Sequence, residues 1–302
     1  MVNQKRNTWK GFSALLGSML LHAFSGVVVV GLAAAFGNVA QVSFRAFAAF
    51  ILTLIWLLIT GFRYKTANHY DTKWLLVDIV CRPIFNICFV YAVLDIGPTA
   101  ALFYLFASKL ISGAMIKVLF GSKDEKPAWP VDYICYLAVL SGLFVFTFPI
   151  NHALEIGVLF AMTSGFFEAV KSEAMGKIKV KPVDKPVVAL YEFVSMAIIT
   201  TSVVLISGQH FVVAAVTPYV WLVLGMSAMI AVGGLTLELT GFAEFDQDLG
   251  NAVLASEMGT ASILNYFVLG TGMSLTQIIG SMMLVSSLAM IAVAAYRRKV
   301  TK

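Results

Sequence analysis

Eight ionisable side chains lie deep inside long apolar stretches of this chain, where a charge is costly. They are His22, Arg45, Arg82, Lys109, Glu168, Glu192, Glu238 and Glu257. A charged side chain at the centre of a bilayer costs on the order of 3 kcal/mol on insertion scales. Such residues therefore face one another or a polar cavity. Because the basic residues all precede the acidic ones, we expect a cavity whose two halves carry opposite charge.

Opposite charges on two sides of one cavity suit a zwitterionic ligand. Arg82 or Lys109 would bind a carboxylate, and the planar guanidinium of an arginine favours bidentate binding. Glu168 or Glu257 would bind an amine. Both glutamates are also candidates to take up and release a coupled proton, as intramembrane carboxylates do in proton relays.

Two further residues are candidates for the same cavity. His22 can exchange a proton or donate a hydrogen bond, and Tyr104 can line the cavity by stacking. The alternative is that the charged residues are structural ion pairs that fix the packing of helices. Glu168 and Lys171 are three residues apart, so they can pair on one helix face. Both interpretations remain open at this point.

Three of the eight side chains, and Lys117, are expected nearer the membrane surfaces than the rest. With a rise of about 1.5 Å per residue, Arg45 and Glu192 lie about 9 Å in from opposite ends of their apolar stretches. Each is expected to face a vestibule or to snorkel. Lys117 and Glu238 are expected at the interface.

The composition predicts an all-α polytopic membrane protein. The chain has 302 residues, 60% hydrophobic and 12% charged, with a mean hydropathy of +0.88; soluble domains carry about 25% charged residues. The net charge of +5 does not indicate nucleic acid, because the charges cluster at the ends of apolar runs. The three cysteines lie in apolar runs and are expected to be core residues. We expect no metal and no cofactor.

Ten apolar segments are long enough to cross a bilayer, which requires about 20 residues. They are 11–32, 39–62, 72–95, 99–120, 131–149, 153–176, 186–207, 217–240, 250–270 and 274–296. Lysine and arginine occur at both chain ends and in the loops after the second, fourth and sixth segments. The loops after the odd-numbered segments contain neither residue. This positive-inside pattern predicts a multi-pass protein of the cytoplasmic (inner) membrane with both termini in the cytoplasm.

The ten segments divide into two weakly similar halves, 1–150 and 151–302. When 11–120 is laid over 157–270, Gly11 falls on Gly157, His22 on Glu168 and, after a gap, Arg45 on Glu192. Five is an odd number, so the second half enters the membrane in the opposite sense. An inverted-topology repeat is therefore predicted, and secondary transporters place their binding sites between such halves.

The last third of the chain carries a recognisable pattern. A helix of small residues with Glu257 near its middle leads through a short turn into Gln277-Ile278-Ile279-Gly280. This arrangement resembles the C-terminal signature of EamA-type members of the drug/metabolite transporter superfamily. The resemblance implies the same five-plus-five fold over nearly the whole chain.

The resemblance also implies a secondary transporter, most often an exporter, that works by alternating access. With the charged residues it predicts transport of an amino acid or a similar zwitterion, with the proton as the candidate coupling ion, and no enzyme activity. A monomer or homodimer in the lipid bilayer is expected. An organic-anion or nucleotide-type exchanger of the same fold is the main alternative. A membrane-embedded lipid enzyme that uses His22 and Glu168 is the other.

Overall fold

A computed structural model describes residues 7–60, 71–120, 130–148, 155–178, 184–208, 217–245, 247–270 and 274–300. Within these ranges every regular element is a helix and no strand is present, so the all-α prediction is confirmed. The helices are α1 Thr8–His22, α2 Ser25–Phe36, α3 Ala40–Ile59, α4 Thr72–Phe120, α5 Pro130–Thr147, α6 Ile156–Ile178, α7 Lys185–Ile206, α8 Pro218–Glu244, α9 Gln247–Ala255, α10 Glu257–Leu269 and α11 Leu275–Val300.

Six segments of the described chain are long and apolar enough to cross a membrane, which indicates a membrane protein. They are Thr8–Phe36, Ala40–Ile59, Thr72–Gly113, Lys185–Ile206, Pro218–Glu244 and Leu275–Val293. The predicted span at 153–176 is not among them, because α6 carries Glu168, Lys171 and Glu173 close together. The full set of ten spans stays a prediction.

Three breaks interrupt the helices, and two of them adjoin candidate site residues. The predicted span 11–32 is divided at Ala23 and Phe24, directly after His22. The span 250–270 is divided at Ser256, directly before Glu257. Within α4, Gly97 adopts a positive φ of 80°, which glycine tolerates best, and the helix changes direction there. That break lies in the turn predicted between 72–95 and 99–120.

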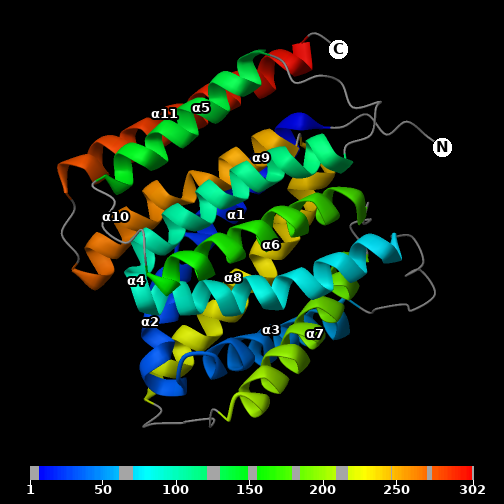
Figure 1. Ribbon diagram of the computed structural model, residues 1–302. Coiled ribbons are helices and arrows are strands. Elements are labelled where there is room, and N and C mark those ends of the chain that lie inside the picture. Colours follow the sequence, from blue (N-terminus) through cyan, green and yellow to red (C-terminus); the bar gives the residue numbers. More distant parts are fainter. Residues whose placement is uncertain are drawn as a thin grey trace.

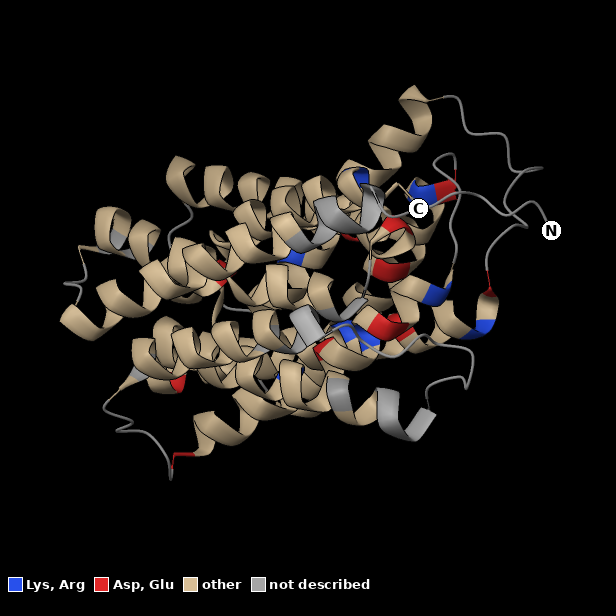
Figure 2. Cartoon of the chain, turned by 90° about the horizontal axis from the view of Figure 1, so that it is seen from above, with Lys and Arg blue, Asp and Glu red and all other residues tan. Residues whose placement is uncertain are grey.

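The helices form layers that run roughly parallel or antiparallel to one another (Figure 1). The pair α5 and α11 packs together at one side of the bundle, and the pair α3 and α7 packs at the other. Between them α1 contacts α8, and α4 contacts α6 along most of its length. Figure 2 shows that Lys, Arg, Asp and Glu gather mainly in the half of the bundle nearer the chain ends.

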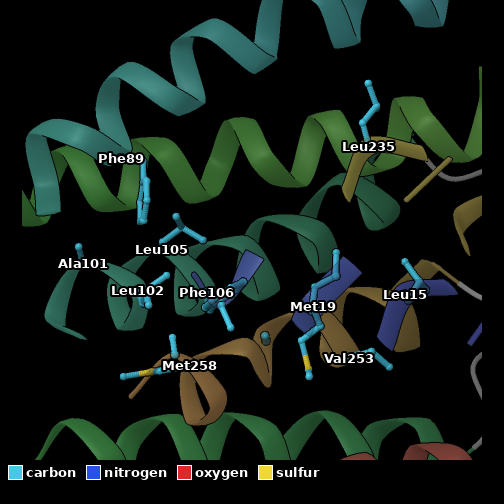
Figure 3. Packing of buried hydrophobic residues seen from close by; sticks show 14 of the residues in the cluster. Leu15, Met19, Phe89, Ala101, Leu102, Leu105, Phe106, Leu235, Val253 and Met258 are labelled. Atoms are coloured by element: carbon cyan, nitrogen blue, oxygen red, sulfur yellow. The ribbon is translucent and has the colours of Figure 1, made fainter. Parts of the chain in front are cut away.

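A continuous apolar core holds the inner helices together. Met19 of α1, Phe106 of α4, Val253 of α9 and Met258 of α10 are buried in it (Figure 3). Many outward-facing residues are also apolar, and Ile206 is 87% exposed. Water would disfavour so much exposed apolar surface, whereas lipid chains would cover it. This surface supports the membrane assignment independently of helix length.

Candidate functional site

A cavity lies among the inner helices, and the centre of a water molecule can occupy about 80 Å³ of it. Its ionisable lining residues are His22, Arg45, Arg82, Lys109, Glu168, Lys171, Glu238 and Glu257. The rest of the lining is largely apolar: Phe85, Phe89, Leu102, Leu105, Phe106, Phe193, Met196, Ile230, Ala231 and Leu254, with the polar Ser25 and Asn86. Every helix from α1 to α10 except α5 contributes a residue.

The carboxylate of Glu168 is shared between two lysines. Its Oε1 lies 3.1 Å from Nζ of Lys109, and its Oε2 lies 2.7 Å from Nζ of Lys171. The first contact joins α6 to the second half of α4, and the second is the pairing within α6 that the sequence predicts. All three side chains are buried. Buried charges need partners of this kind, since desolvation costs several kcal/mol per ion.

Glu238 of α8 is the centre of a second set of contacts. Its Oε2 accepts a hydrogen bond from Nζ of Lys171 at 3.2 Å and lies 3.7 Å from Nη2 of Arg82. Its Oε1 lies 3.2 Å from Nε2 of His22. Because Lys171 also contacts Glu168, these groups form one continuous network across α1, α4, α6 and α8.

Arg82 extends the network to α7. Its Nε contacts the carboxylate of Glu192, a residue that is fully buried. Asp78 lies one helical turn before Arg82, is also fully buried, and interacts electrostatically with both Arg82 and Glu192. The guanidinium of Arg82 therefore compensates the charges of two carboxylates, Asp78 and Glu192. Its Nη2 also approaches a third carboxylate, that of Glu238.

Local backbone features position Arg82. Pro83 has no N–H, so it leaves the carbonyl oxygen of Ile79 without its helical donor. The hydroxyl of Ser195 on α7 lies 3.4 Å from that oxygen, but its single hydrogen has a nearer acceptor in the carbonyl oxygen of Glu192, at 2.8 Å. Asn86 donates from Nδ2 to the carbonyl oxygen of Arg82 at 2.9 Å. The helix continues through Pro83, and the hydrogen bond from Asn86 fixes the backbone carbonyl of Arg82 just before it.

Two glycines allow the charged side chains to meet. A Cβ atom on Gly234 would lie 2.5 Å from Nε2 of His22, so the imidazole occupies the space that a side chain would fill. A Cβ atom on Gly165 would lie 2.9 Å from the backbone nitrogen of Lys109. Gly165 thus lets α6 approach α4 closely enough for Lys109 to reach Glu168.

Two charged residues of the lining stand apart from this network. Arg45 of α3 forms no ion pair with any described residue, and its Nη1 is buried without a hydrogen-bond partner. Glu257, 6% exposed, has no cation at ion-pair distance among the described residues. Its one hydrogen bond in this part of the chain comes from the hydroxyl of Ser25, at 3.5 Å.

The structure brings together five of the six residues proposed as ligand contacts: His22, Arg82, Lys109, Glu168 and Glu257. Tyr104 does not line the cavity. It packs edge-on against Phe103 with ring centroids 5.0 Å apart, and its hydroxyl is buried without a hydrogen-bond partner among the described residues.

Two placements predicted from helical rise are wrong. Glu238 is 2% exposed and lies at the centre of the network, so its side chain does not face a membrane surface. Glu192 is fully buried against Arg82 and neither snorkels nor faces a vestibule. Arg45 lines the cavity. The side chain of Lys117 lies outside the described residues.

Sequence reasoning left two members of the network out of the site. The sequence indicates Lys171 only as a local partner of Glu168, although it also contacts Glu238. Asp78 is not among the eight side chains that the sequence indicates. The signal that identifies it is its spacing of four residues from Arg82, because an acid and a base at that spacing share one helix face.

Comparison with known proteins identifies a structure of similar fold but does not indicate an activity. No family model and no curated protein matches this chain. A solved structure described only as "Crystal structure of protein" superposes with a TM-score of 0.75, covering 96% of this chain and 99% of that chain at 15% sequence identity. At that identity the likeness shows a shared fold alone, which extends over nearly the whole chain.

Proposed function

We propose that this chain is a secondary transporter that moves a small polar metabolite, an amino acid or a similar zwitterion, by alternating access. The observation that carries the proposal is the cavity itself, which holds eight ionisable side chains inside an apolar helical bundle. Burying ionisable side chains inside a membrane-spanning bundle costs free energy, and such residues typically mark substrate or ion pathways. We place the protein in the cytoplasmic membrane with both termini in the cytoplasm, and export is the proposed direction.

Pairs of equivalent contacts support a five-plus-five inverted repeat of 1–150 and 151–302. The backbone N–H of Asn7, before α1, donates to Oε2 of Glu244 at the end of α8 at 2.8 Å. The backbone N–H of Gly157, at the start of α6, donates to Oδ2 of Asp95 at the end of the first half of α4 at 2.7 Å. In the proposed repeat α1 corresponds to α6, and α8 to the first half of α4. A corresponding contact between the two halves then occurs twice, with the donor once in the first half and once in the second.

The helix pairs at the two sides of the bundle fit the same repeat. The second segment of each half, α3 and α7, pack together, and so do the fifth segments, α5 and α11. This symmetry, with the C-terminal pattern around Glu257, supports placing the chain near the EamA-type drug/metabolite transporters. The binding cavity then lies between the halves, as in other transporters with inverted repeats.

The formal charge of the buried groups supports proton coupling. The carboxylates are Asp78, Glu168, Glu192, Glu238 and Glu257, and the permanent cations are Arg45, Arg82, Lys109 and Lys171. With His22 neutral, the carboxylates are in excess by one charge, which one proton would neutralise. Glu257 is the first candidate to carry that proton because it has no cationic partner at ion-pair distance. Glu168, which is held by two lysines, is the second.

The main alternative is exchange of an organic anion or a nucleotide-type metabolite. The guanidinium of Arg45, which has no carboxylate partner among the described residues, favours it. The excess of carboxylates around the cavity disfavours it, because a strongly anionic ligand would add to an already negative group of charges. A lipid enzyme would need its polar residues near one membrane interface. His22 and Glu168 instead line a cavity enclosed by nine of the described helices, which disfavours the lipid enzyme.

Uptake by proteoliposomes tests the proposal directly. Purified protein is reconstituted, and radiolabelled amino acids, organic anions and organic amines are screened with and without an imposed proton gradient. Protein-free liposomes are the control. The proposal predicts saturable uptake of a zwitterion that a proton gradient accelerates. Transport of anions but not zwitterions would favour the exchanger, and the absence of any transport across the panel would overturn the proposal.

A further inference from the structure

Most of the charges in the cavity are unavailable to a ligand, because they already hold one another. Arg82, Lys109 and Lys171 each have a carboxylate at ion-pair distance. A ligand carboxylate that bound one of them would have to displace a buried glutamate, and a glutamate left unpaired at this depth is strongly unfavourable. The expectation that Arg82 or Lys109 binds the ligand is therefore disfavoured by their own partners.

Arg45 and Glu257 have the opposite character. Arg45 presents a guanidinium with a buried Nη1 that no described residue satisfies. Glu257 presents a carboxylate that receives, from the described residues, a single long hydrogen bond, donated by Ser25. Both line the cavity, so each can gain a charge-assisted contact without breaking another. They come from α3 and α10, which belong to different halves of the proposed repeat.

We propose that Arg45 and Glu257 bind the two charged ends of a zwitterionic ligand, with the carboxylate on Arg45 and the ammonium on Glu257. This inference rests on the proposed transport function and assigns its recognition residues. The remaining charged residues form the scaffold that keeps the cavity open and its helices in register. Much of the rest of the lining is apolar, including Phe106, Phe193 and Ile230, and it would accommodate an apolar side chain of the ligand.

The test separates the two ends of the ligand. Leucine serves as the reference zwitterion, 4-methylpentanoate lacks its ammonium group, and 3-methylbutylamine lacks its carboxylate. Both analogues are smaller than leucine, so neither is excluded by size. Each competes against a radiolabelled zwitterion in binding to purified protein, and the inhibition constants give a ratio of analogue to leucine. The ratios are measured for wild type, Arg45→Gln and Glu257→Gln.

In wild type each analogue should bind at least about tenfold more weakly than leucine, since each loses one charge-assisted contact. Glu257→Gln should reduce the discrimination against 4-methylpentanoate to less than about twofold and leave the discrimination against 3-methylbutylamine in place. Arg45→Gln should do the reverse, and Arg45→Lys should retain part of the discrimination. The matched controls are Lys10→Gln, at the exposed start of α1, and Glu173→Gln, which pairs with Lys177 away from the cavity; both should keep wild-type ratios.

The outcomes distinguish this inference from the function beneath it. If zwitterions bind and are transported, but the two substitutions weaken leucine and both analogues equally, Arg45 and Glu257 are structural and the inference is wrong while transport stands. If Arg82 or Lys109 substitutions change the ratios instead, the assignment is also wrong. If no zwitterion binds or moves, the inference and the zwitterion proposal fail together. Monodisperse elution and an unchanged unfolding midpoint confirm that each variant is folded.

Discussion

The imidazole of His22 lies 3.2 Å from the carboxylate of Glu238 and reaches it across Gly234, which is one helical turn earlier on α8. Ser18, one turn earlier on α1, places its hydroxyl 3.3 Å from the carbonyl oxygen of Gly234. The two helices therefore contact each other closely at this glycine. The contact holds the broken end of α1 against the ion network and places His22 at the cavity wall.

Replacing Gly234 with alanine should separate His22 from Glu238. The new Cβ would lie 2.5 Å from Nε2, too close for the imidazole to stay in place. Overpacking of this kind typically costs about 1–3 kcal/mol, so the unfolding midpoint in detergent should fall. Nitrogen NMR of labelled histidine, with His22→Gln to assign the signal, should also report the changed environment of the ring.

The matched control for this variant is Gly225→Ala on the same helix, where an added Cβ meets no atom within 4 Å. Its unfolding midpoint and histidine spectrum should match those of wild type. Equal destabilisation by both substitutions would mean that α8 is sensitive to any change, and that the His22 contact has no special role.

Arg82 and Glu192 should be energetically coupled. Removal of one partner of a buried pair leaves an uncompensated charge and costs about 3–5 kcal/mol. We expect Arg82→Met and Glu192→Met each to be strongly destabilising, and the double variant to be less so than the sum. Equilibrium unfolding of the four proteins gives the coupling energy.

The pair Lys177 and Glu173 provides the comparison. It lies on α6 with partly exposed side chains and a 2.7 Å contact. Pairs four residues apart on a helix surface contribute only about 0.3–0.5 kcal/mol. Additive effects at Arg82 and Glu192, similar in size to those of this surface pair, would contradict a structural network.

The sequence predicted the helical class and the local pair Glu168 and Lys171, because both depend on residues that are near in the chain. Contacts between distant helices were not accessible in this way. Glu238 was placed at the interface by counting from a predicted span end at residue 240, whereas α8 continues to Glu244. At about 1.5 Å per residue, those extra residues put Glu238 a further 6 Å inside the helix.

Glu192 was misplaced for a related reason. Depth along a helix axis says nothing about the direction in which a side chain points. Glu192 points into the bundle, where Arg82 from a segment about 110 residues earlier in the chain offers a partner. The unpaired state of Arg45 and Glu257 was equally inaccessible, since it appears only after the partners of all other charges are known.

Thiol labelling should establish the topology on which the inverted repeat depends. Lys10 and Ser207 are exposed residues at the start of α1 and just after α7, and seven predicted spans separate them. An odd number of spans places them on opposite sides. We expect a membrane-impermeant reagent to label Lys10→Cys from the cytoplasmic side and Ser207→Cys from the outside. The native cysteines are free and buried, so their background should be low.

Labelling of both positions from the same side would require an even number of spans between them. The five-plus-five arrangement would then be wrong, whatever the substrate. Labelling after solubilisation in detergent serves as the control that both engineered thiols are reactive.

Proton movement should accompany the substrate in a fixed ratio. The buried groups carry one excess negative charge when His22 is neutral, which one proton can neutralise. The ammonium of the proposed ligand and that proton would compete for the same carboxylate, Glu257, so binding of one should release the other. We therefore expect about one proton to be exchanged per zwitterion, measured with a pH-sensitive dye inside the liposomes alongside radiolabelled flux. Glu257→Gln fixes a neutral side chain at this position, so proton movement should be lost even at substrate concentrations high enough to sustain flux. Proton movement that persists in this variant would assign the proton to Glu168 or His22 and leave Glu257 with ligand binding alone.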